Sequence, residues 1–358
     1  MRGKIIFEEH IAMPDDDKDG FPACRNVDSL REALLDLHDA RLKEMNANGV
    51  ELAIISQNTP GPQGLTDPKE SAAYAKRAND YLANVVDRAP CRFAALAAIP
   101  MHDPEDAVAE VTRCINELGM VGVNLNDGQQ YVNQATGRIS EYFYDDPRYD
   151  VFWATVEKLD VPVYLHPRAP LPDDIQRLYA TRPWLLGPTY SFIRDTSFHV
   201  LAICTSGVFD RFPGVKLAVG HFGEGILAYL SRLDYWLEKR DRGRGLRSQK
   251  TVRQYLESNV FITSAGHFST PVLLHAMSEI GIDRLLFSVD TPYANITEAS
   301  EWIDTLPISH GDVEKFGRTN ALKLFPRLAT RLRSDEVAKE QRDRQRVLFT
   351  VNAGFEQD

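Results

Sequence analysis

The chain has 358 residues, of which 43% are hydrophobic and 26% charged, and its formal net charge is −10. This balance is normal for a globular protein, excludes wholesale disorder, and leaves ample chain to bury a core without disulfide or metal staples. The acidic charge does not favour nucleic acid or an anionic membrane as a partner.

No targeting or membrane segment is predicted. The N-terminus, MRGKIIFEEH, has too short an apolar run for a signal peptide, and no stretch approaches the roughly 18–20 apolar residues of a membrane span. The four cysteines, Cys24, Cys91, Cys114 and Cys204, form no C-x-x-C pair. We therefore expect reduced thiols in a cytoplasmic protein.

Eight short apolar runs recur along the chain, separated by longer stretches with helical spacing. Such continuous runs are typical of strands buried on both faces, as in a parallel sheet. In chain order the runs are 4–7 (KIIF), 51–56 (ELAIIS), 92–99, 121–125, 161–165, 216–220, 259–263 and 284–289. The sequence thus predicts eight strands.

The stretches between the runs carry helix start and stop signals. One helix is predicted over 28–49, with Asp28-Ser29 as its cap and Gly49 as its end, and others over 103–119, 198–209 and 270–281. We expect Asp195 or Thr196 to open the third of these. Strands alternating with helices predict an α/β fold, a (β/α)₈ TIM barrel, with a doubly wound open sheet as the alternative.

Two segments interrupt the alternation, 126–147 and 168–194, both long and rich in Pro, Asp, Tyr and Arg. They follow the fourth and fifth strands, so in a barrel both are expected as loops at the catalytic face. We expect a single barrel domain over 1–328 and a charged C-terminal tail over 329–358. That tail is either a solvated helix or an arm that packs on a neighbouring subunit.

Polar residues follow four of the predicted strands where each strand ends. Glu8 and His10 follow the first, and residues two apart on a strand point to the same side. His166, His221 and Asp290 follow later strands, so all five should gather at the C-terminal mouth of a parallel barrel. Carboxylates and imidazoles suit Zn²⁺, Mn²⁺ or a similar divalent ion, and these residues predict a metal site. His267, after the seventh strand, is a weaker candidate.

Four motifs resemble a known family. They are EEH at 8–10, YLHPR at 164–168, GHFGE at 220–224 and FSVD at 287–290. They resemble the amidohydrolase-superfamily decarboxylases that act on ortho-hydroxybenzoates. The likeness is greatest to γ-resorcylate (2,6-dihydroxybenzoate) decarboxylases, followed by 2,3-dihydroxybenzoate and salicylate decarboxylases, and it runs from residue 3 to about residue 325. It implies the metal-dependent barrel of that superfamily.

The resemblance also implies a ligand set and a general acid. Glu8, His10, His166 and Asp290 match the ligands of one divalent ion, which would be Zn²⁺ or Mn²⁺ with Mg²⁺ as the alternative. Asp290 is also the expected proton donor. No organic cofactor is expected.

On the substrate side, the resemblance implies that His221 contacts the substrate beside the metal and that Glu224 orients His221. Arg232, Asn126 and Phe192 match substrate-binding positions. The implied partner is a small aromatic acid, and the implied assembly is a homodimer or homotetramer.

The predicted activity is therefore a divalent-metal-dependent carboxy-lyase. It would reversibly and non-oxidatively decarboxylate an ortho-hydroxybenzoate, most simply 2,6-dihydroxybenzoate to resorcinol and CO₂, with 2,3-dihydroxybenzoate and salicylate left open. A metal-dependent hydrolase of a small amide or lactone is the alternative, because one barrel hosts many chemistries. A catalytically silent binding protein is the third interpretation.

Overall fold

A computed structural model describes residues 1, 3–16 and 27–332 of the chain. Eight parallel strands form one sheet in the order β1-β2-β3-β4-β7-β8-β9-β10. Their bounds are β1 Lys4–Ile11, β2 Val50–Gln57, β3 Phe93–Ala98, β4 Gly122–Asn126, β7 Val163–His166, β8 Leu217–Val219, β9 Val260–Thr263 and β10 Leu285–Leu286. The eight predicted strands are confirmed. Their order never reverses along the sheet, which excludes the doubly wound alternative.

The first and last strands meet without a regular ladder. Instead, the His10 N–H donates to the Thr291 carbonyl at 2.8 Å, and the Phe7 N–H donates to Ser288 Oγ at 3.2 Å. The Ser288 hydroxyl also donates to the Phe7 carbonyl. This seam joins β1 to the segment after β10 and closes the sheet into a barrel.

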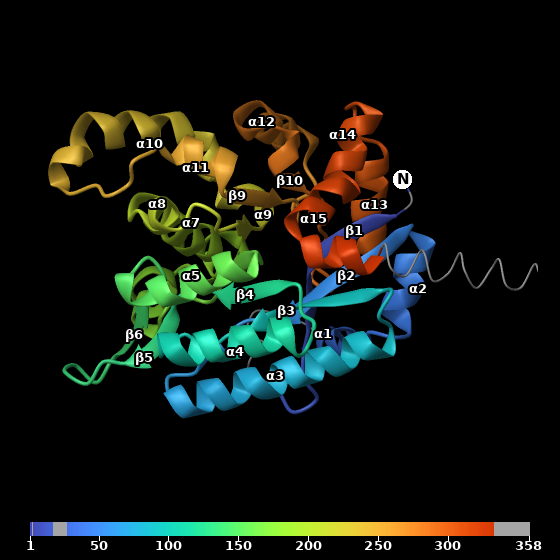
Figure 1. The fold of residues 1–358 in the computed structure, drawn as a ribbon, viewed down its shortest axis with the longest axis horizontal. Coiled ribbons are helices and arrows are strands. Elements are labelled where there is room, and N and C mark those ends of the chain that lie inside the picture. The colour runs from blue at the N-terminus through green and yellow to red at the C-terminus, as the bar shows by residue number, and fades with distance from the viewer. Residues whose placement is uncertain (2, 17–26, 333–358) are drawn as a thin grey trace, which may run out of the picture.

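Helices surround the strands on several sides (Figure 1). Their bounds are α1 Val27–Leu35, α2 Ala40–Ala47, α3 Pro68–Arg88, α4 Pro104–Asn116, α5 Asp150–Leu159, α6 Pro172–Asp174, α7 Ser191–Thr205, α8 Val208–Arg211, α9 His221–Glu224, α10 Leu230–Trp236, α11 Val252–Ser258, α12 Thr270–Ile280, α13 Ile296–Asp304, α14 His310–Glu314 and α15 Asn320–Leu324. The predicted helices over 103–119 and 270–281 correspond to α4 and α12. Asp103 caps α4 by accepting the Glu105 N–H at 2.9 Å.

The protein has two large hydrophobic clusters, one inside the barrel of strands and one between the strands and the helices. The inner cluster takes residues from seven of the eight strands, Ile5 and Phe7 from β1 and Leu286 from β10 among them. Leu328 and Leu332 belong to the same cluster, so the last described residues pack on the barrel interior. The outer cluster lies between the strands and the helices. The rest of the predicted tail, from 333 on, lies outside the described residues, as does Cys24.

Two predicted helices are divided in the structure. The prediction over 28–49 is α1 and α2, because Asp36 Oδ1 accepts the N–H groups of Asp39 and Ala40, both at 3.1 Å, and so starts a second helix. The prediction over 198–209 begins earlier, at Ser191. Neither Asp195 nor Thr196 opens this helix, because both lie inside it. The Thr196 hydroxyl instead lies 3.5 Å from Asp127 Oδ2.

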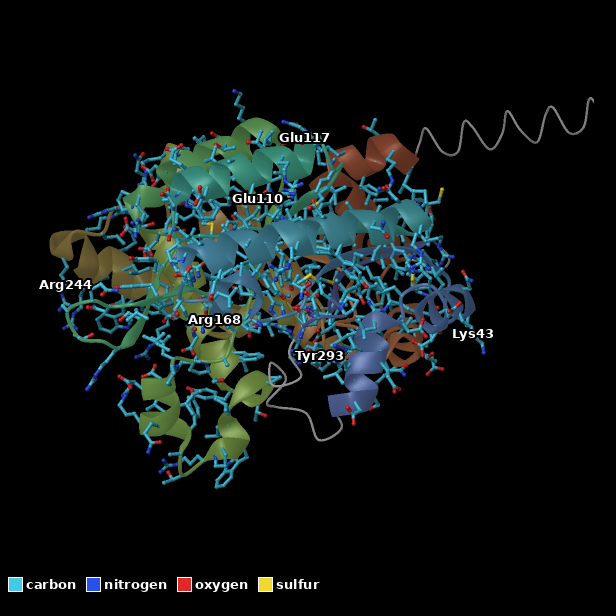
Figure 2. All side chains as sticks on the ribbon, turned by 90° about the horizontal axis from the view of Figure 1, so that it is seen from below. Lys43, Glu110, Glu117, Arg168, Arg244 and Tyr293 are labelled. Carbon is cyan, nitrogen blue, oxygen red and sulfur yellow. The ribbon has the colours of Figure 1, made fainter. Side chains whose placement is uncertain are left out.

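The segment predicted as a long loop over 126–147 contains a hairpin. Strands β5 (Gln129–Val132) and β6 (Ile139–Tyr142) pair antiparallel, with Tyr131 and Tyr142 stacked at 3.9 Å between ring centroids. Beneath the hairpin, Arg168 Nη2 donates to Glu141 Oε2 at 2.6 Å. The segment between β7 and α7 projects from the body of the molecule near Arg168 (Figure 2).

Tyr144 connects the hairpin segment to the barrel. Its hydroxyl donates to the Asn126 carbonyl at 2.7 Å, its N–H donates to His199 Nε2 at 2.8 Å, and its carbonyl accepts from Trp153 Nε1 at 2.8 Å. Tyr144, Trp153 and His199 are fully buried. The end of β4 is therefore held by a satisfied polar network. None of the described helices is both long and apolar enough to cross a membrane.

Tyr144→Phe should lower the free energy of unfolding by about 1–3 kcal/mol, because the buried Asn126 carbonyl loses its donor. Chemical denaturation monitored by circular dichroism measures the change. Tyr131→Phe, in the same hairpin, is the matched control. The Tyr131 hydroxyl makes no hydrogen bond within the described chain, so its removal should change the unfolding free energy by less than about 0.5 kcal/mol. Equal losses in the two variants would contradict the assignment.

Candidate active site

Glu8 lies at a bulge in β1. Phe7 pairs with Ile54 and Glu9 with Ile55, so Glu8 has no partner on β2, and its φ is 96°. Strict alternation predicted that Glu8 and His10 point the same way. The structure brings them together through a bulge, a device that re-aims a side chain near active sites.

Three ligand-type side chains converge at this end of the barrel. Ligand atoms of Glu8, His10 and His166 all lie within 4.8 Å of one another, and all three residues are buried. Asp290 joins them, with its Oδ1 3.0 Å from His10 Nε2. The structure thus brings together the four residues predicted to hold a metal.

The orientation of His166 follows from a relay of amides. The Ile99 carbonyl can only accept, so Gln63 Nε2 faces it at 2.6 Å. Gln63 Oε1 then faces Asn126 Nδ2 at 3.2 Å, which leaves Asn126 Oδ1 toward His166 Nδ1 at 3.2 Å. His166 Nδ1 therefore carries the proton, and the lone pair of Nε2 points toward Glu8, 3.6 Å away. Outer partners of this kind fix the tautomer of metal-binding histidines.

Two hydroxyls hold one oxygen of the Glu8 carboxylate. Tyr164 Oη donates to Glu8 Oε2, and Thr263 Oγ1 donates to the same oxygen at 3.3 Å. A Cβ at Gly220 would stand 2.6 Å from Tyr164 Oη and 2.7 Å from Glu8 Oε2, so only glycine fits there. Glu8 Oε1 makes no hydrogen bond.

A left-handed turn carries His221 and Glu224. The φ angles of His221, Phe222, Gly223 and Glu224 are 50°, 54°, 75° and 52°. Each non-glycine residue in this region costs roughly 1–2 kcal/mol. The turn places His221 Nδ1 2.5 Å from Glu224 Oε1 and His221 Nε2 3.4 Å from Glu8 Oε1.

Backbone strain is concentrated here. Of the six non-glycine residues with positive φ in the described chain, five are in this site, namely Glu8, His221, Phe222, Glu224 and Asp290. Such residues persist only where their surroundings hold them, and they cluster at functional sites.

The electrostatics of the cluster oppose buried negative charge. Burial raises the pKa of Glu8 to about 8. Burial and the neighbouring His10 hold the pKa of His166 well below its usual value, so His166 is neutral. Burial lowers the pKa of His221, but the charges of Glu224 and Glu8 outweigh it and hold that pKa well above its usual value. Burial raises the pKa of Asp290, but the neighbouring imidazoles of His10 and His221 outweigh it and lower that pKa to about 2.

These observations fit a divalent cation. Ligand atoms at about 2.0–2.2 Å from one ion stand up to about 4.4 Å apart, close to the spacing of this cluster. Within the described residues, Glu8 Oε1 and both ring nitrogens of His10 are buried without hydrogen-bond partners, and a cation near Glu8 would stabilise its ionised form. Neutral imidazole is the form of His166 that binds a metal.

Other residues predicted to belong to the site have fewer contacts with the metal cluster. Arg232 is exposed on α10, and Phe192 is half-buried on α7. Within the described chain, no hydrogen bond or ion pair links Arg232 to the metal cluster. His267 is exposed, with its ring 5.6 Å from that of Phe222. Asn126 contacts the cluster through His166, as described above.

Several residues that help to build the site were not predicted from the sequence. Tyr164 precedes His166 by two residues on β7, so strand alternation alone would have placed it on the same side. Thr263 is the last residue of β9, just as His166 is the last residue of β7. No local pattern identifies Gln63, which comes from the turn Gly61–Gly64 after β2. Tyr293 packs its ring 5.5 Å from that of His10 and is exposed beside the cluster (Figure 2).

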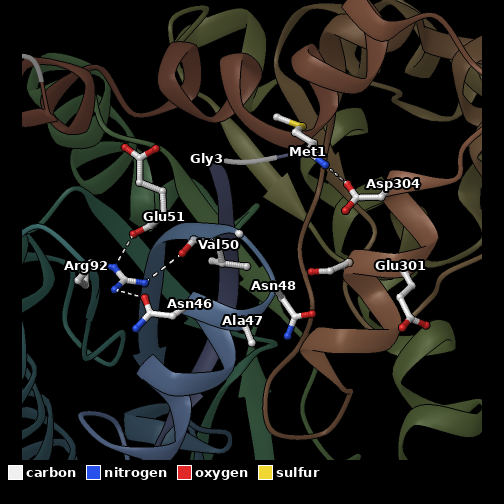
Figure 3. A pocket seen from close by; sticks show the side chains of 12 residues that line it. Met1, Gly3, Asn46, Ala47, Asn48, Val50, Glu51, Arg92, Glu301 and Asp304 are labelled. Atoms are coloured by element: carbon white, nitrogen blue, oxygen red, sulfur yellow. Dashed lines mark hydrogen bonds and ion pairs between the residues drawn. The ribbon is translucent and has the colours of Figure 1, made fainter.

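A cavity of about 900 Å³ lies at the opposite end of the barrel, where β1 and β2 begin (Figure 3). Two of its charged groups, Arg92 and Asp304, are already paired. Arg92 donates to the Glu51 and Val50 carbonyls and to Asn46 Oδ1, and Asp304 accepts from Lys4 Nζ at 3.0 Å. The cavity therefore lacks the convergent reactive groups of the cluster around Glu8.

Comparison with known proteins gives consistent results. The amidohydrolase family matches residues 36–327. A γ-resorcylate decarboxylase from Rhizobium radiobacter is 43% identical over 330 residues, which is 91% of this chain and 98% of that protein.

Solved structures agree with the sequence relatives. The crystal structure of a 2,6-dihydroxybenzoate decarboxylase complexed with 2,6-dihydroxybenzoate matches with a TM-score of 0.84 and 42% identity, covering 91% of this chain and 100% of that one. A dihydroxybenzoic acid decarboxylase from Polaromonas sp. JS666, with bound manganese and the inhibitor 2-nitroresorcinol, matches with a TM-score of 0.83 and 40% identity, covering 91% and 97%. With this coverage and identity, the chain belongs to the amidohydrolase family and is similar over most of its length to γ-resorcylate decarboxylases.

Proposed function

We propose that this protein is a metal-dependent carboxy-lyase that removes CO₂ from an ortho-hydroxybenzoate. The favoured substrate is 2,6-dihydroxybenzoate, which gives resorcinol. One observation carries the proposal, namely the buried cluster of Glu8, His10 and His166 with Asp290 3.0 Å from His10. The relatives named above support the substrate class, and 2,3-dihydroxybenzoate and salicylate are the alternatives for the panel below.

The chemistry requires a proton at carbon. Direct loss of CO₂ would leave an electron pair outside the ring π-system. If the carbon that bears the carboxylate is protonated first, the C–C bond can break, its electron pair returns to the ring, and aromaticity is restored as CO₂ leaves. An ortho phenolate makes this protonation feasible because it adds electron density to that carbon.

Asp290 is the proposed general acid, and its exposed fraction of 15% leaves it accessible from the mouth of the barrel. Gly266 packs closely against this carboxylate, since a Cβ there would stand 3.0 Å from Asp290 Oδ2 and would crowd it. His221 is proposed to hydrogen-bond the substrate hydroxyl, and Glu224 to orient its imidazole through Nδ1. Arg232, Asn126 and Phe192 remain proposed substrate contacts.

Glu8, His10, His166 and Asp290 are the proposed ligands of one divalent ion. The bound ion would supply a Lewis acid that fixes the carboxylate and adjacent hydroxyl of the substrate and lowers the pKa of that hydroxyl. The manganese in the Polaromonas relative supports Mn²⁺, with Zn²⁺ and Mg²⁺ as the other candidates. No step in the proposed reaction needs an organic cofactor. The hydrolase alternative is not favoured, because the relatives named above are decarboxylases.

A hydroxybenzoate panel tests the reaction. The protein with Mn²⁺ should convert 2,6-dihydroxybenzoate to resorcinol, and the reaction should run backwards in concentrated bicarbonate. Because chelation needs a hydroxyl next to the carboxylate, 3- and 4-hydroxybenzoate should be inert. Product identity by chromatography checks the outcome. Equal turnover of 4-hydroxybenzoate and salicylate, or activity that survives thorough chelation of metal, would refute the proposal.

Two histidine variants separate metal binding from chemistry. His10→Ala should weaken Mn²⁺ binding by at least about 10–100-fold, the effect of losing even an outer partner of a metal ligand. His221→Asn should keep the metal yet lose about 10²–10⁴-fold in kcat, the usual range for a positioned acid–base group. Metal titration and steady-state kinetics on the same samples distinguish the two effects. Full activity in metal-loaded His221→Asn contradicts its role.

We also propose that residues 1–328 form one catalytic domain and that the chain assembles as a homodimer or homotetramer, with the tail from 329 to 358 at a subunit contact. Large aromatic side chains are exposed near α7 and α10, including Trp184 (68%), Phe198 (60%) and Tyr235 (55%). A hollow of about 650 Å³ between Phe198 and Leu233 adds apolar surface to this face. Exposed patches of this kind mark interaction sites.

Light scattering at micromolar concentration should therefore give a mass of at least twice 40.4 kDa. Phe198→Glu should shift the population toward monomer, because it places a charge in the apolar face. Phe143→Glu, which alters a half-buried neighbour of Phe198, tests whether the effect is confined to exposed positions. A wild-type monomer would contradict the assembly.

A further inference from the structure

The proposed chemistry leaves Glu9 unused, although it lies between two proposed metal ligands. Glu8 and His10 point into the site, whereas Glu9 points to the other side and is fully buried. Its carboxylate does not belong to the metal cluster. A buried carboxylate is costly unless it is well paired, so its contacts indicate its role.

Both oxygens of Glu9 bind the backbone around Asp290. The Val289 N–H donates to Glu9 Oε1, and the Thr291 N–H donates to Glu9 Oε2, each at 3.2 Å. These two amides stand directly before and after Asp290 in the chain. One carboxylate therefore grips both sides of a single residue.

The backbone of Asp290 is strained, so it needs such contacts to hold it. Asp290 has φ 78°, a region that non-glycine residues rarely occupy. The His10 N–H also donates to the Thr291 carbonyl at 2.8 Å, so β1 holds the segment at a third point. Arg41 in turn fixes this part of β1, because its Nη1 donates to the His10 carbonyl at 2.8 Å in the buried interior.

We propose that Glu9 is a positioning residue that fixes the Asp290 carboxylate by binding, as a clamp, the backbone N–H groups of the two residues next to it, Val289 and Thr291. This inference deepens the proposed function and rests on it where it concerns proton delivery by Asp290. The segment EEH at 8–10 then contributes to the site in two ways. Its first and third side chains enter the site, and its second aligns the proton donor contributed by the opposite side of the barrel seam.

The clamp requires two acceptors on one side chain. Glu9→Gln keeps the size of the side chain but replaces one acceptor by an NH₂ group, which would face a backbone N–H. One of the two bonds is then lost, and the strained turn at Asp290 is held on one side only. A misplacement of about 1 Å at a reacting group can cost about 10²-fold in rate.

Ser264→Ala is the matched control. The Ser264 hydroxyl donates to the Ser288 carbonyl at 3.0 Å and accepts the Ser288 N–H at 3.1 Å, and the residue is fully buried. Its removal loosens the same segment two residues before Asp290 but leaves the Glu9 clamp intact. A role limited to stability predicts similar behaviour of the two variants.

The experiment compares wild type, Glu9→Gln and Ser264→Ala, each loaded with Mn²⁺. Glu9→Gln should lower kcat on 2,6-dihydroxybenzoate by about 10–100-fold with little change in KM, and should alter the electron paramagnetic resonance spectrum of bound Mn²⁺. Ser264→Ala should match wild type in both readouts after correction for the folded fraction. Glu9→Asp, which keeps two acceptors on a shorter arm, should give an intermediate rate and serves if Glu9→Gln does not fold.

The outcomes separate the two ideas. If wild type turns over no hydroxybenzoate, the proposed function fails, while the Mn²⁺ spectra still test the clamp. A wild-type spectrum and wild-type kcat in Glu9→Gln would overturn the clamp. Equal rate losses in Glu9→Gln and Ser264→Ala would also overturn it, because they would show a general loosening of the seam.

Discussion

The buried carboxylate of Glu8 is the constraint on which the mouth of the barrel depends. A charge removed from water must be paired, and here one oxygen takes the hydroxyls of Tyr164 and Thr263 while the other faces two imidazoles. Gly220 has no side chain because any Cβ would displace this arrangement. One carboxylate on β1 is therefore surrounded by residues from β7, from β9 and from the turn after β8. Such agreement among distant segments is what fixes a site within a fraction of an ångström.

Strained backbone serves the same purpose at three points. The bulge at Glu8, the left-handed turn from His221 to Glu224 and the positive φ of Asp290 each aim a side chain that regular strand geometry would direct elsewhere. Together they cost several kcal/mol, about 1–3 kcal/mol for each strained residue. The two large hydrophobic clusters on either side of the strand wall supply the stability that tolerates this cost. The hydrophobic stability of the barrel thus offsets the backbone strain at its mouth.

The sequence predicted the strands and the ligand cluster because both depend on local pattern. Apolar runs mark strands buried on both faces, and polar residues placed at their ends must meet in a parallel barrel. The division of 28–49 into two helices escaped prediction because the helical spacing of apolar residues continues through Asp36, and only the contact of its side chain with the Asp39 and Ala40 N–H groups shows that a second helix begins there. The hairpin over 129–142 was hidden by its half-buried pattern, and the amide relay through Gln63 depends on a long-range contact that no spacing reveals.

The electrostatic state of Asp290 explains how substrate and acid depend on each other in the proposed reaction. The neighbouring imidazoles of His10 and His221 outweigh burial and lower the pKa of Asp290 to about 2, so the group is ionised before substrate arrives. A proton donor needs the opposite condition. A hydroxybenzoate brings a carboxylate and a developing phenolate beside Asp290, and like charges at close range raise the pKa of a carboxyl group. His221 Nε2 lies 3.9 Å from Asp290 Oδ2 and would hydrogen-bond the substrate hydroxyl, so its influence on the pKa of Asp290 would weaken. In this scheme the proton released when the substrate hydroxyl ionises passes to Asp290, which then delivers it to the ring carbon.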